Sequence, residues 1–226
     1  MNKDTIREHT FLSNQFSEES VILDLGSHKG EFSIEFASKY LYKKIIAVEA
    51  NPELFEETLA ASSNVKNLYA INAVVSNTSS TSGSFYVNPK LPETSSEIQS
   101  MADELWWYTE ETSDIDLNPT QKINVQYLTL ENIISEFNLD RIDLIKMDIE
   151  GSEWEILSNL SKAQSDIIIQ ISVEFHDFYG KKYREKSIKA IDHLKKLGYT
   201  FEHKPGYWGF GTPYADCIFY KKEATI

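Results

Sequence analysis

Residues 21–30 read Val-Ile-Leu-Asp-Leu-Gly-Ser-His-Lys-Gly, and this stretch decides the fold. The apolar run 21–25 is typical of a buried parallel strand, and apolar residues then recur after Gly30 with the spacing of an amphipathic helix. Gly26 and Gly30 flank the connection, where the absence of a Cβ permits a sharp turn and the close approach of a ligand. The pattern predicts a strand, a ligand-binding turn with Asp24 beside it, and a helix.

The spacing of the glycines in this turn distinguishes between two nucleoside-containing cofactors, a dinucleotide such as NAD and S-adenosylmethionine. A dinucleotide turn needs G-x-G-x-x-G, whereas this chain has D-x-G-x-x-x-G, which suits a ligand with an ammonium group and no phosphate, such as S-adenosylmethionine (SAM). A second apolar run ends in Glu49, whose carboxylate can accept both ribose hydroxyls of either cofactor. The alternative is an ordinary strand-to-helix turn followed by an exposed acid. We predict SAM contacts from Asp24, Gly26, Ser27, Gly30, Glu49 and Ala50.

Composition narrows the classes of protein. The 226 residues, 41% of them hydrophobic, suit one α/β domain with a full core. No apolar run is long enough for a membrane span, the N-terminus shows no secretory signal, and the single Cys217 forms no internal disulfide, so a cytoplasmic location is expected. The net charge of −13 and the lack of a basic track argue against a nucleic-acid partner. Nothing here predicts the oligomeric state.

The chain is divided into a short N-terminal helical extension, residues 1–20, and one domain, residues 21–222. A helix begins at Pro52, a first-turn position that proline favours. Residues 65–76 are expected to form a third strand, with Asn72 and Ala73 near its end, beside the adenine of the cofactor. The alternative for Asn72 is a turn asparagine.

An acidic insertion, at about residues 88–122, separates the two halves of the domain. A short strand at 84–87 precedes it, and Trp106, Trp107 and Tyr108 stand in its middle. Between Leu91 and Gln121 it carries eight acidic residues and no Lys or Arg: Glu93, Glu97, Asp103, Glu104, Glu110, Glu111, Asp114 and Asp116. Loops of this length in compact domains are commonly lids or binding loops, so we predict a substrate lid, with an oligomer contact or a mobile loop as alternatives.

The second informative stretch is residues 142–157, which predicts a buried strand ending at Asp148, a turn with Glu150 and Gly151, and a helix from about Ser152. Ligands of open α/β sheets bind outside the carboxyl ends of the strands. Asp148 and Glu150 are therefore expected at the site, and Asp148 also beside the cofactor. Lys146 would be buried in the sheet and needs a partner.

A strand is predicted over residues 166–176, because apolar and polar residues alternate there. Glu174, on its polar face, is a plausible partner for Lys146, and His176 would lie at the open end, over the cleft. The chain then continues with an amphipathic helix at 181–197 and two strands at 199–204 and 215–221, joined by an aromatic, glycine-rich loop with Trp208.

The pattern resembles a class I SAM-dependent methyltransferase and, more narrowly, the FkbM family. The matching runs are LDLGSHKGEFS, AVEANPELF, INAVVSN, DLIKMDIEGSEWEIL and SVEFH. The resemblance implies an α/β, Rossmann-like, doubly wound seven-stranded sheet with its last strand antiparallel and helices on both faces. It also implies O-methylation of a hydroxyl on a sugar, polysaccharide or related natural product.

For the chemistry we predict that His176 is the general base that takes the proton of the acceptor hydroxyl, with Asp148 and Glu150 as the next candidates. A divalent ion on these three residues is chemically possible, but no metal is assigned. The acidic insertion and the tryptophans suit a neutral or basic small-molecule or glycan acceptor.

Two other functions stay open. An NAD-dependent oxidoreductase is disfavoured by the missing middle glycine and by Tyr183, which stands where a Tyr179-x-x-x-Lys pair would need lysine. A catalytically silent SAM-binding interaction module is disfavoured by the polar residues at three strand ends.

Overall fold

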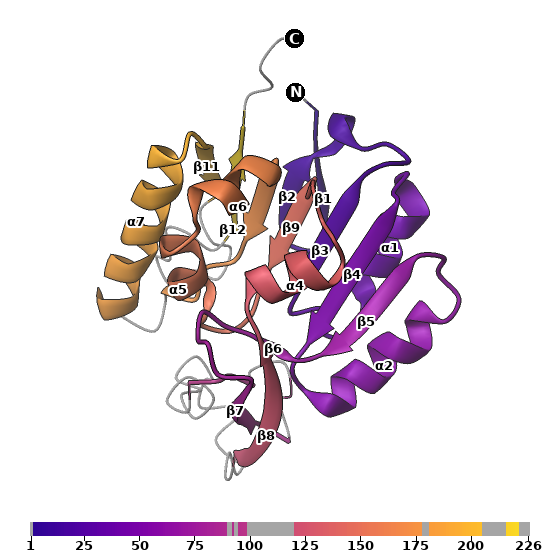
Figure 1. Ribbon diagram of the computed structural model, residues 1–226, viewed down its shortest axis with the longest axis vertical. Coiled ribbons are helices and arrows are strands. Elements are labelled where there is room, and N and C mark those ends of the chain that lie inside the picture. The colour runs from indigo at the N-terminus through magenta and orange to yellow at the C-terminus, as the bar shows by residue number, and fades with distance from the viewer. Residues whose placement is uncertain are drawn as a thin grey trace, which may run out of the picture.

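A twisted seven-stranded sheet forms the centre of the computed structural model (Figure 1). The structure describes residues 2–89, 92, 95–98, 120–177, 181–204 and 216–221. The strand order is β11–β12–β10–β9–β3–β4–β5, and β12 is antiparallel to both of its neighbours. The predicted fold class is thereby confirmed. The strands are β3 (Val21–Leu25), β4 (Lys44–Glu49), β5 (Leu68–Asn72), β9 (Leu144–Met147), β10 (Gln170–Val173), β11 (Thr200–Lys204) and β12 (Asp216–Tyr220).

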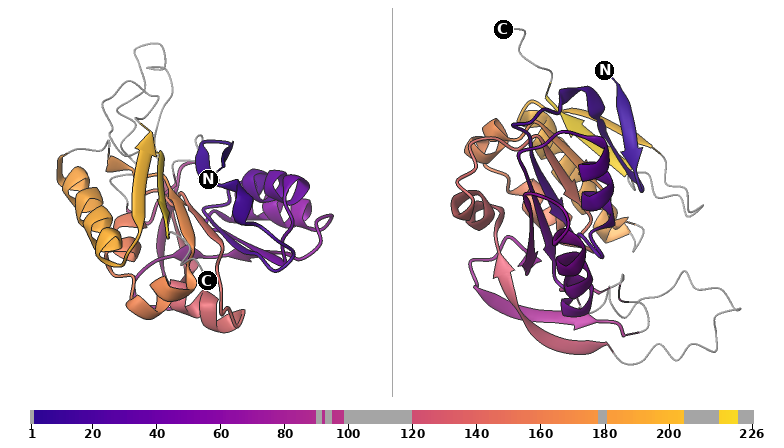
Figure 2. Two further views of the ribbon diagram at one scale, coloured as in Figure 1. Left: turned by 90° about the horizontal axis from the view of Figure 1, so that it is seen from above. Right: turned by 90° about the vertical axis from the view of Figure 1, so that its right-hand side faces the viewer.

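Helices cover both faces of the sheet (Figure 2). One face carries α1 (Glu31–Lys39) and α2 (Pro52–Ser62). The other carries α4 (Leu130–Glu136), α5 (Glu153–Ser158), α6 (Lys162–Ile167) and α7 (Lys181–Lys196). Among the described helices, none combines the length and the apolar character that crossing a membrane requires.

The two faces follow from strand alternation. Ile22 packs with Phe32 and Phe36 of α1, whereas Leu23 and Leu25 pack in the larger core of the α4, α5 and α7 side. Successive side chains of β3 therefore enter opposite cores. A strand buried on both faces reads as a continuous apolar run, which is why this stretch could be recognised in the sequence.

The connection after β3 brings two loops into backbone contact. Gly26 and Gly30 have φ values of 76° and 77°, a region that glycine adopts without a steric penalty. A Cβ at Gly26 would lie 1.7 Å from the carbonyl oxygen of Asp148, at the end of β9. Only glycine lets these two strand ends meet.

The N-terminal segment is a β-hairpin, so the helix expected over residues 1–20 is wrong. β1 (Lys3–Ile6) pairs with β2 (His9–Leu12), and one 3₁₀ turn (Ser13–Gln15) follows. The side chain of Gln170 in β10 accepts from the Leu12 N–H at 2.8 Å and donates to the Leu12 carbonyl at 3.2 Å. These long-range bonds select the hairpin and also satisfy a polar side chain buried in the central sheet.

Two strand boundaries also differ from the prediction. The expected third strand at 65–76 is shorter and separates into β5 and β6 (Val74–Val75), which belong to different sheets. The expected strand at 166–176 starts later, because residues up to Ile167 belong to α6. A capping box between Ser161 and Gln164 starts this short helix.

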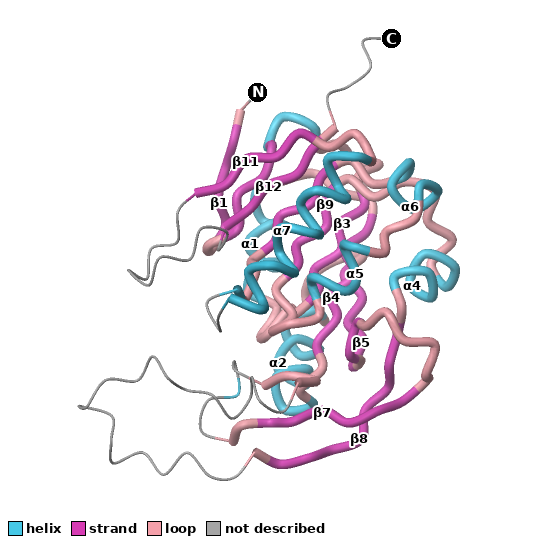
Figure 3. The backbone as a smooth tube through the Cα atoms, turned by 90° about the vertical axis from the view of Figure 1, so that its left-hand side faces the viewer, coloured by secondary structure: helices cyan, strands magenta, loops and turns pink. Residues whose placement is uncertain are grey.

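A second, three-stranded sheet of order β6–β8–β7 lies past the carboxyl end of β5 (Figure 3). β7 (Ser82–Val87) and β8 (Gln121–Leu128) form an antiparallel ribbon, so the acidic insertion connects two paired strands. Most of the insertion, with Trp106, Trp107 and Tyr108, lies outside the described residues, as does Trp208. Its role as a lid stays a prediction.

Replacing Gly26 by alanine tests the close contact between the strand ends. We expect Gly26→Ala to lower the free energy of unfolding by about 3 kcal/mol or more, because the new methyl group overlaps the Asp148 carbonyl. Urea denaturation followed by circular dichroism measures this loss.

Gly198→Ala is the matched control. Gly198 also has a positive φ, 97°, but no atom lies within 4 Å of its built Cβ, so only backbone strain of about 1–2 kcal/mol is expected. Equal losses in the two variants would contradict the argument.

Candidate active site

A buried lysine of the central sheet, Lys146, contacts the turn after β3 and holds it in place. Lys146 of β9 pairs in register with Asp24 of β3, and its Nζ lies 3.4 Å from Asp24 Oδ1 and 3.8 Å from Asp148 Oδ2. It also donates a hydrogen bond to the Gly26 carbonyl. Burial alone would lower the pKa of Lys146, but the carboxylates of Asp24 and Asp148 raise it above its ordinary value.

These contacts correct the predicted partner of Lys146. Asp24 and Asp148 supply its ion pairs, whereas Glu174 lies beyond it, beside Asp148. Asp24 is fully buried, its Oδ2 accepts from Ser33 Oγ at 2.7 Å, and it does not line the cavity described below. Asp24 therefore positions the turn from beneath.

Glu49 ends β4 at the other side of the turn. Its two carboxylate oxygens accept from the His28 and Asn51 backbone N–H groups, each at 2.8 Å. Burial raises the pKa of Glu49 to about 7, against the effect of these two hydrogen bonds. Glu49 is thus a carboxylate at a strand tip that titrates near neutral pH.

Asn72 and Ala73 follow β5, as predicted, but they have different surroundings. The Asn72 side-chain amide donates to the Glu49 and Ala50 carbonyls at 2.9 and 3.2 Å, so it braces the end of β4. Ala73, in contrast, lines the cavity. The contacts of Asn72 agree with the alternative given above, a turn asparagine with a structural role.

A cavity of about 300 Å³ opens between the strand ends and the three-stranded sheet. The predicted residues on its wall include Gly26, Ser27, Glu49, Ala50, Ala73, Asp148 and Glu150, together with the unpredicted His9. The Ser27 hydroxyl is buried and finds no hydrogen-bond partner among the described residues. Because buried hydroxyls are normally paired, Ser27 fits a site that a polar ligand completes.

The loop after β9 carries strain where it meets the cavity. Glu150 has a φ of 53°, in a region that residues with a Cβ seldom adopt, and Gly151 follows with a φ of 116°. Glu153 holds this loop, because its carboxylate accepts from the Gly151 N–H at 3.0 and 3.1 Å. Non-glycine residues in this conformation cluster at functional sites.

His176 lies between carboxylates below the cavity. Its Nδ1 is 2.6 Å from Glu153 Oε1, and its Nε2 is 3.2 Å from Glu150 Oε2 and 3.6 Å from Asp148 Oδ1. Burial alone would lower the pKa of His176, but Glu150 and Glu153 raise it well above its ordinary value. The two carboxylates therefore favour the protonated ring.

This environment does not suit the predicted role of His176 as a base. The side chain is 3% exposed and is absent from the wall of the cavity. A protonated ring with a carboxylate at each nitrogen holds Glu150 in place but has no free lone pair for a substrate proton.

Asp148 and Glu150 differ in charge state. Burial alone would raise the pKa of Asp148, but Lys146, with His9 and His176, holds it well below its usual range. For Glu150, burial raises the pKa, and His176 only partly opposes this effect. Asp148 is thus a fixed anion, whereas Glu150 is the more basic of the two groups that face the cavity.

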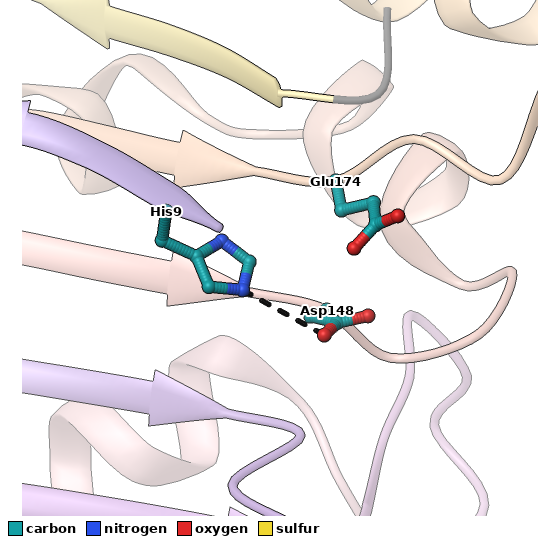
Figure 4. Close-up of side chains that lie close together, drawn as sticks. All are labelled: His9, Asp148 and Glu174. Atoms are coloured by element: carbon teal, nitrogen blue, oxygen red, sulfur yellow. Dashed lines mark ion pairs between the residues drawn. The ribbon is translucent and has the colours of Figure 1, made fainter. Parts of the chain in front are cut away.

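His9 is the residue that sequence reasoning missed. It ends the hairpin turn at the start of β2, is 5% exposed, and directs Nε2 toward Asp148 Oδ2 at 3.6 Å (Figure 4). Glu174 stands beside the same carboxylate, and burial together with the Asp148 charge raises its pKa well above the ordinary value. No motif marked His9, because the fold of the hairpin alone brings it to the strand ends.

The family is decided by a sequence comparison. The family model described as "Methyltransferase FkbM domain" matches residues 24–201. The chain belongs to this FkbM methyltransferase family. The match covers both the turn after β3 and the Asp148–Glu150 loop, and it confirms the expected resemblance.

Two methyltransferases are similar to this FkbM chain. Methyltransferase sdnD of Sordaria araneosa is 25% identical over 188 residues, which cover 76% of this chain and 72% of that protein. Methyltransferase 1 of Beauveria bassiana is 27% identical over 178 residues, which cover 73% and 68%. These relatives support methyltransferase activity and leave the acceptor unassigned.

Solved structures agree on the fold. Methyltransferase FkbM from Methylobacillus flagellatus has a TM-score of 0.53 at 12% identity; the alignment covers 91% of this chain but only 44% of that one. An rRNA methylase from Streptococcus thermophilus gives 0.52 at 12% identity, with 92% and 90% covered. A Streptococcus mutans methyltransferase candidate in complex with SAH gives 0.50 at 10% identity, with 92% and 93% covered.

The buried lysine offers a test of the energetics of the FkbM site. Lys146→Met leaves the Asp24 carboxylate in the core without its cation, which should cost about 3–5 kcal/mol of unfolding free energy. Urea denaturation at pH 7 measures the change.

Lys162→Met is the matched control, because it removes an ion pair with Asp166 on the exposed surface of α6. It should leave the denaturation midpoint within error, since solvent screens such pairs. Similar effects of the two substitutions would contradict the role given to Lys146.

Proposed function

We propose that this chain is a SAM-dependent O-methyltransferase that acts on a hydroxyl of a sugar, a polysaccharide or a related natural product. The observation that carries the proposal is Glu49, a buried carboxylate at the tip of β4 that lines the cavity beside the Gly26 turn. An acid in this position suits the ribose of a nucleoside cofactor. The structural neighbour in complex with SAH supports the choice of cofactor.

The residues around the turn fit such a cofactor. Glu49 would accept from the ribose hydroxyls, with Ala50 and Ala73 along the nucleoside. Gly26 lines the cavity, whereas Gly30 shapes the turn from outside its wall. The Ser27 hydroxyl, which has no partner among the described residues, is available to the ligand. Asp24 acts through the turn rather than by direct contact, since it lies beneath the cavity wall.

The charge around the cavity bears on the acceptor. Four carboxylates, those of Glu8, Glu31, Glu97 and Glu150, line it, in addition to Glu49 and Asp148. Arg7 also lines it but is paired with Glu31 at 2.6 Å. A polyanion would be repelled from such a surface. This supports a neutral or basic acceptor, such as a glycan or small molecule, and argues against nucleic acid.

When bound, SAM supplies an electrophilic methyl group, and the chain must orient an acceptor oxygen in line with it. Glu150 is the group we assign to take the hydroxyl proton, because its raised pKa makes it the better base. Asp148 would accept a hydrogen bond and orient the hydroxyl. His176 is a positioning residue that holds Glu150 through its Nε2.

The alternatives differ in what they bind and transfer. A silent SAM-binding module would bind SAM without methyl transfer to any acceptor. An NAD-dependent oxidoreductase would bind NAD instead, and membership of a methyltransferase family disfavours it.

Calorimetric titration with SAM tests the cofactor assignment. The wild type should bind SAM at micromolar concentration, and Glu49→Gln should weaken binding about tenfold or more, because one charged acceptor for the ribose is lost. Glu57→Gln is the matched control, because Glu57 lies on the exposed side of α2, where it forms an ion pair with Lys29. Absence of SAM binding by the wild type would refute the proposal.

The same titration has a pH signature. With a pKa of about 7, Glu49 is ionised at pH 8 and mostly protonated at pH 6. SAM affinity of the wild type should therefore fall as the pH drops from 8 to 6, whereas the affinity of Glu49→Gln should lack this step. A flat wild-type profile would exclude Glu49 as the ribose acceptor.

Methyl transfer from labelled SAM to a panel of sugars and glycosides tests the chemistry. Glu150→Gln should reduce kcat about 100-fold while the Kd for SAM stays within twofold, as expected for loss of a general base. Glu155→Gln, on the exposed side of α5, should retain the wild-type kcat. An unchanged kcat in Glu150→Gln would remove Glu150 from the mechanism.

A further inference from the structure

Three potential ligand side chains meet beside the cavity from three separate elements: His9 from the N-terminal hairpin, Asp148 after β9 and Glu174 after β10 (Figure 4). One atom of each lies within 4.8 Å of the other two. Two atoms on opposite sides of an ion, at bonds of about 2.2 Å, are about 4.4 Å apart. Only one pair of the three atoms can lie opposite each other, and adjacent ligands are about 3.1 Å apart, so a closure of about 1–2 Å would bring all three atoms into the coordination sphere of one ion.

The polar groups in this cluster are left incomplete by the protein. The His9 ring is 5% exposed, yet its Nε2 stops 3.6 Å from Asp148 Oδ2, which is longer than a hydrogen bond. The Glu174 backbone N–H donates to the Met147 carbonyl. Its carboxylate accepts no side-chain hydrogen bond among the described residues. A buried imidazole and a carboxylate converge on Asp148 without reaching it.

A neighbouring set, Asp148, Glu150 and His176, meets the same distance criterion. There, however, each nitrogen of His176 already has a carboxylate oxygen within 3.2 Å. That set is satisfied by its own contacts, whereas the set that contains His9 is not. His9 and Asp148 also line the cavity, which His176 does not.

We propose that His9, Asp148 and Glu174 bind a divalent cation at the edge of the cavity. One imidazole nitrogen with two carboxylate oxygens suits Mn²⁺, Fe²⁺ or Zn²⁺ better than Ca²⁺, which prefers oxygen alone. Three protein ligands leave coordination positions open toward the cavity. That the acceptor oxygen occupies one of them rests on the proposed function; the metal site itself does not.

Electron paramagnetic resonance of Mn²⁺ tests the site directly on the EDTA-treated full chain. Bound Mn²⁺ loses the sharp signal of the free ion, so titration gives a stoichiometry and a Kd without any assay of activity. One Mn²⁺ per chain is expected, with binding weakened tenfold or more in both His9→Gln and Glu174→Gln. Glu174→Gln lies outside the hairpin, so the test does not depend on one variant alone.

Two control variants separate the alternatives. His193→Gln makes the same exchange at a histidine that lies against the Leu160 carbonyl, and Glu150→Gln removes a ligand of the neighbouring set. Both should keep the Kd for Mn²⁺ within about threefold. Absence of Mn²⁺ binding by the wild type would overturn the proposal. So would loss in Glu150→Gln with retention in His9→Gln and Glu174→Gln, which would assign the ion to the neighbouring set.

Parallel calorimetry with SAM keeps this result apart from the function proposed above. If the wild type binds SAM but does not bind Mn²⁺, the metal site alone is refuted. If the wild type binds Mn²⁺ but does not bind SAM, the cofactor assignment is refuted and the metal site is retained.

Discussion

The ion pair between Lys146 and Asp24 is the constraint on which the site depends. A lysine that is 4% exposed in the middle of a sheet requires carboxylates around its ammonium group, and Asp24 of β3 and Asp148 after β9 supply them. Lys146 also holds the Gly26 carbonyl, so the shape of the turn is fixed from inside the protein. Asp148, its second carboxylate, lies 3.6 Å from a ring nitrogen of both His9 and His176. One buried charge thus connects the turn after β3 with the loop after β9.

Much of the fold could be predicted because its central strands are apolar on both faces and are followed by helical patterns. The antiparallel last strand was implied by family resemblance rather than by periodicity. The N-terminal hairpin was not predicted, because its strands have only four residues each and are stabilised by contacts with β10 and β12. The last two residues of the six-residue helix α6 fall inside the predicted strand, because Ile167 and Ile169 continue an alternating pattern. Short elements carry too few residues for a period to show.

The site was predictable to the level of strand ends and no further. Asp148, Glu150 and Glu49 were placed at the correct edge because parallel strands end together there. The partner of Lys146 was not predicted correctly, because Asp24 and Glu174 lie on opposite sides of β9 and only register distinguishes them. Of the two histidines, His176 lies next to a recognisable motif in the sequence, whereas His9 does not. Which of them faces the cavity depends on Glu153 and on the hairpin, neither of which a local pattern reveals.

The β7–β8 ribbon has a consequence for how the acidic segment can vary. Val87 and Gln121 are paired across the ribbon, so the segment between them leaves and re-enters the fold at neighbouring points. The entropy of closing such a loop rises only with the logarithm of its length, about 0.6 kcal/mol for each doubling. Residues 95–98 are held to the fold, because Ser96 pairs with Tyr86 and its hydroxyl donates to the Glu150 carbonyl. Only changes of length between Ile98 and Gln121 are therefore expected to be nearly neutral for the folding of the seven-stranded sheet. That segment can therefore change in length while the part of the chain that holds Glu49 and the turn after β3 stays under constant structural constraint.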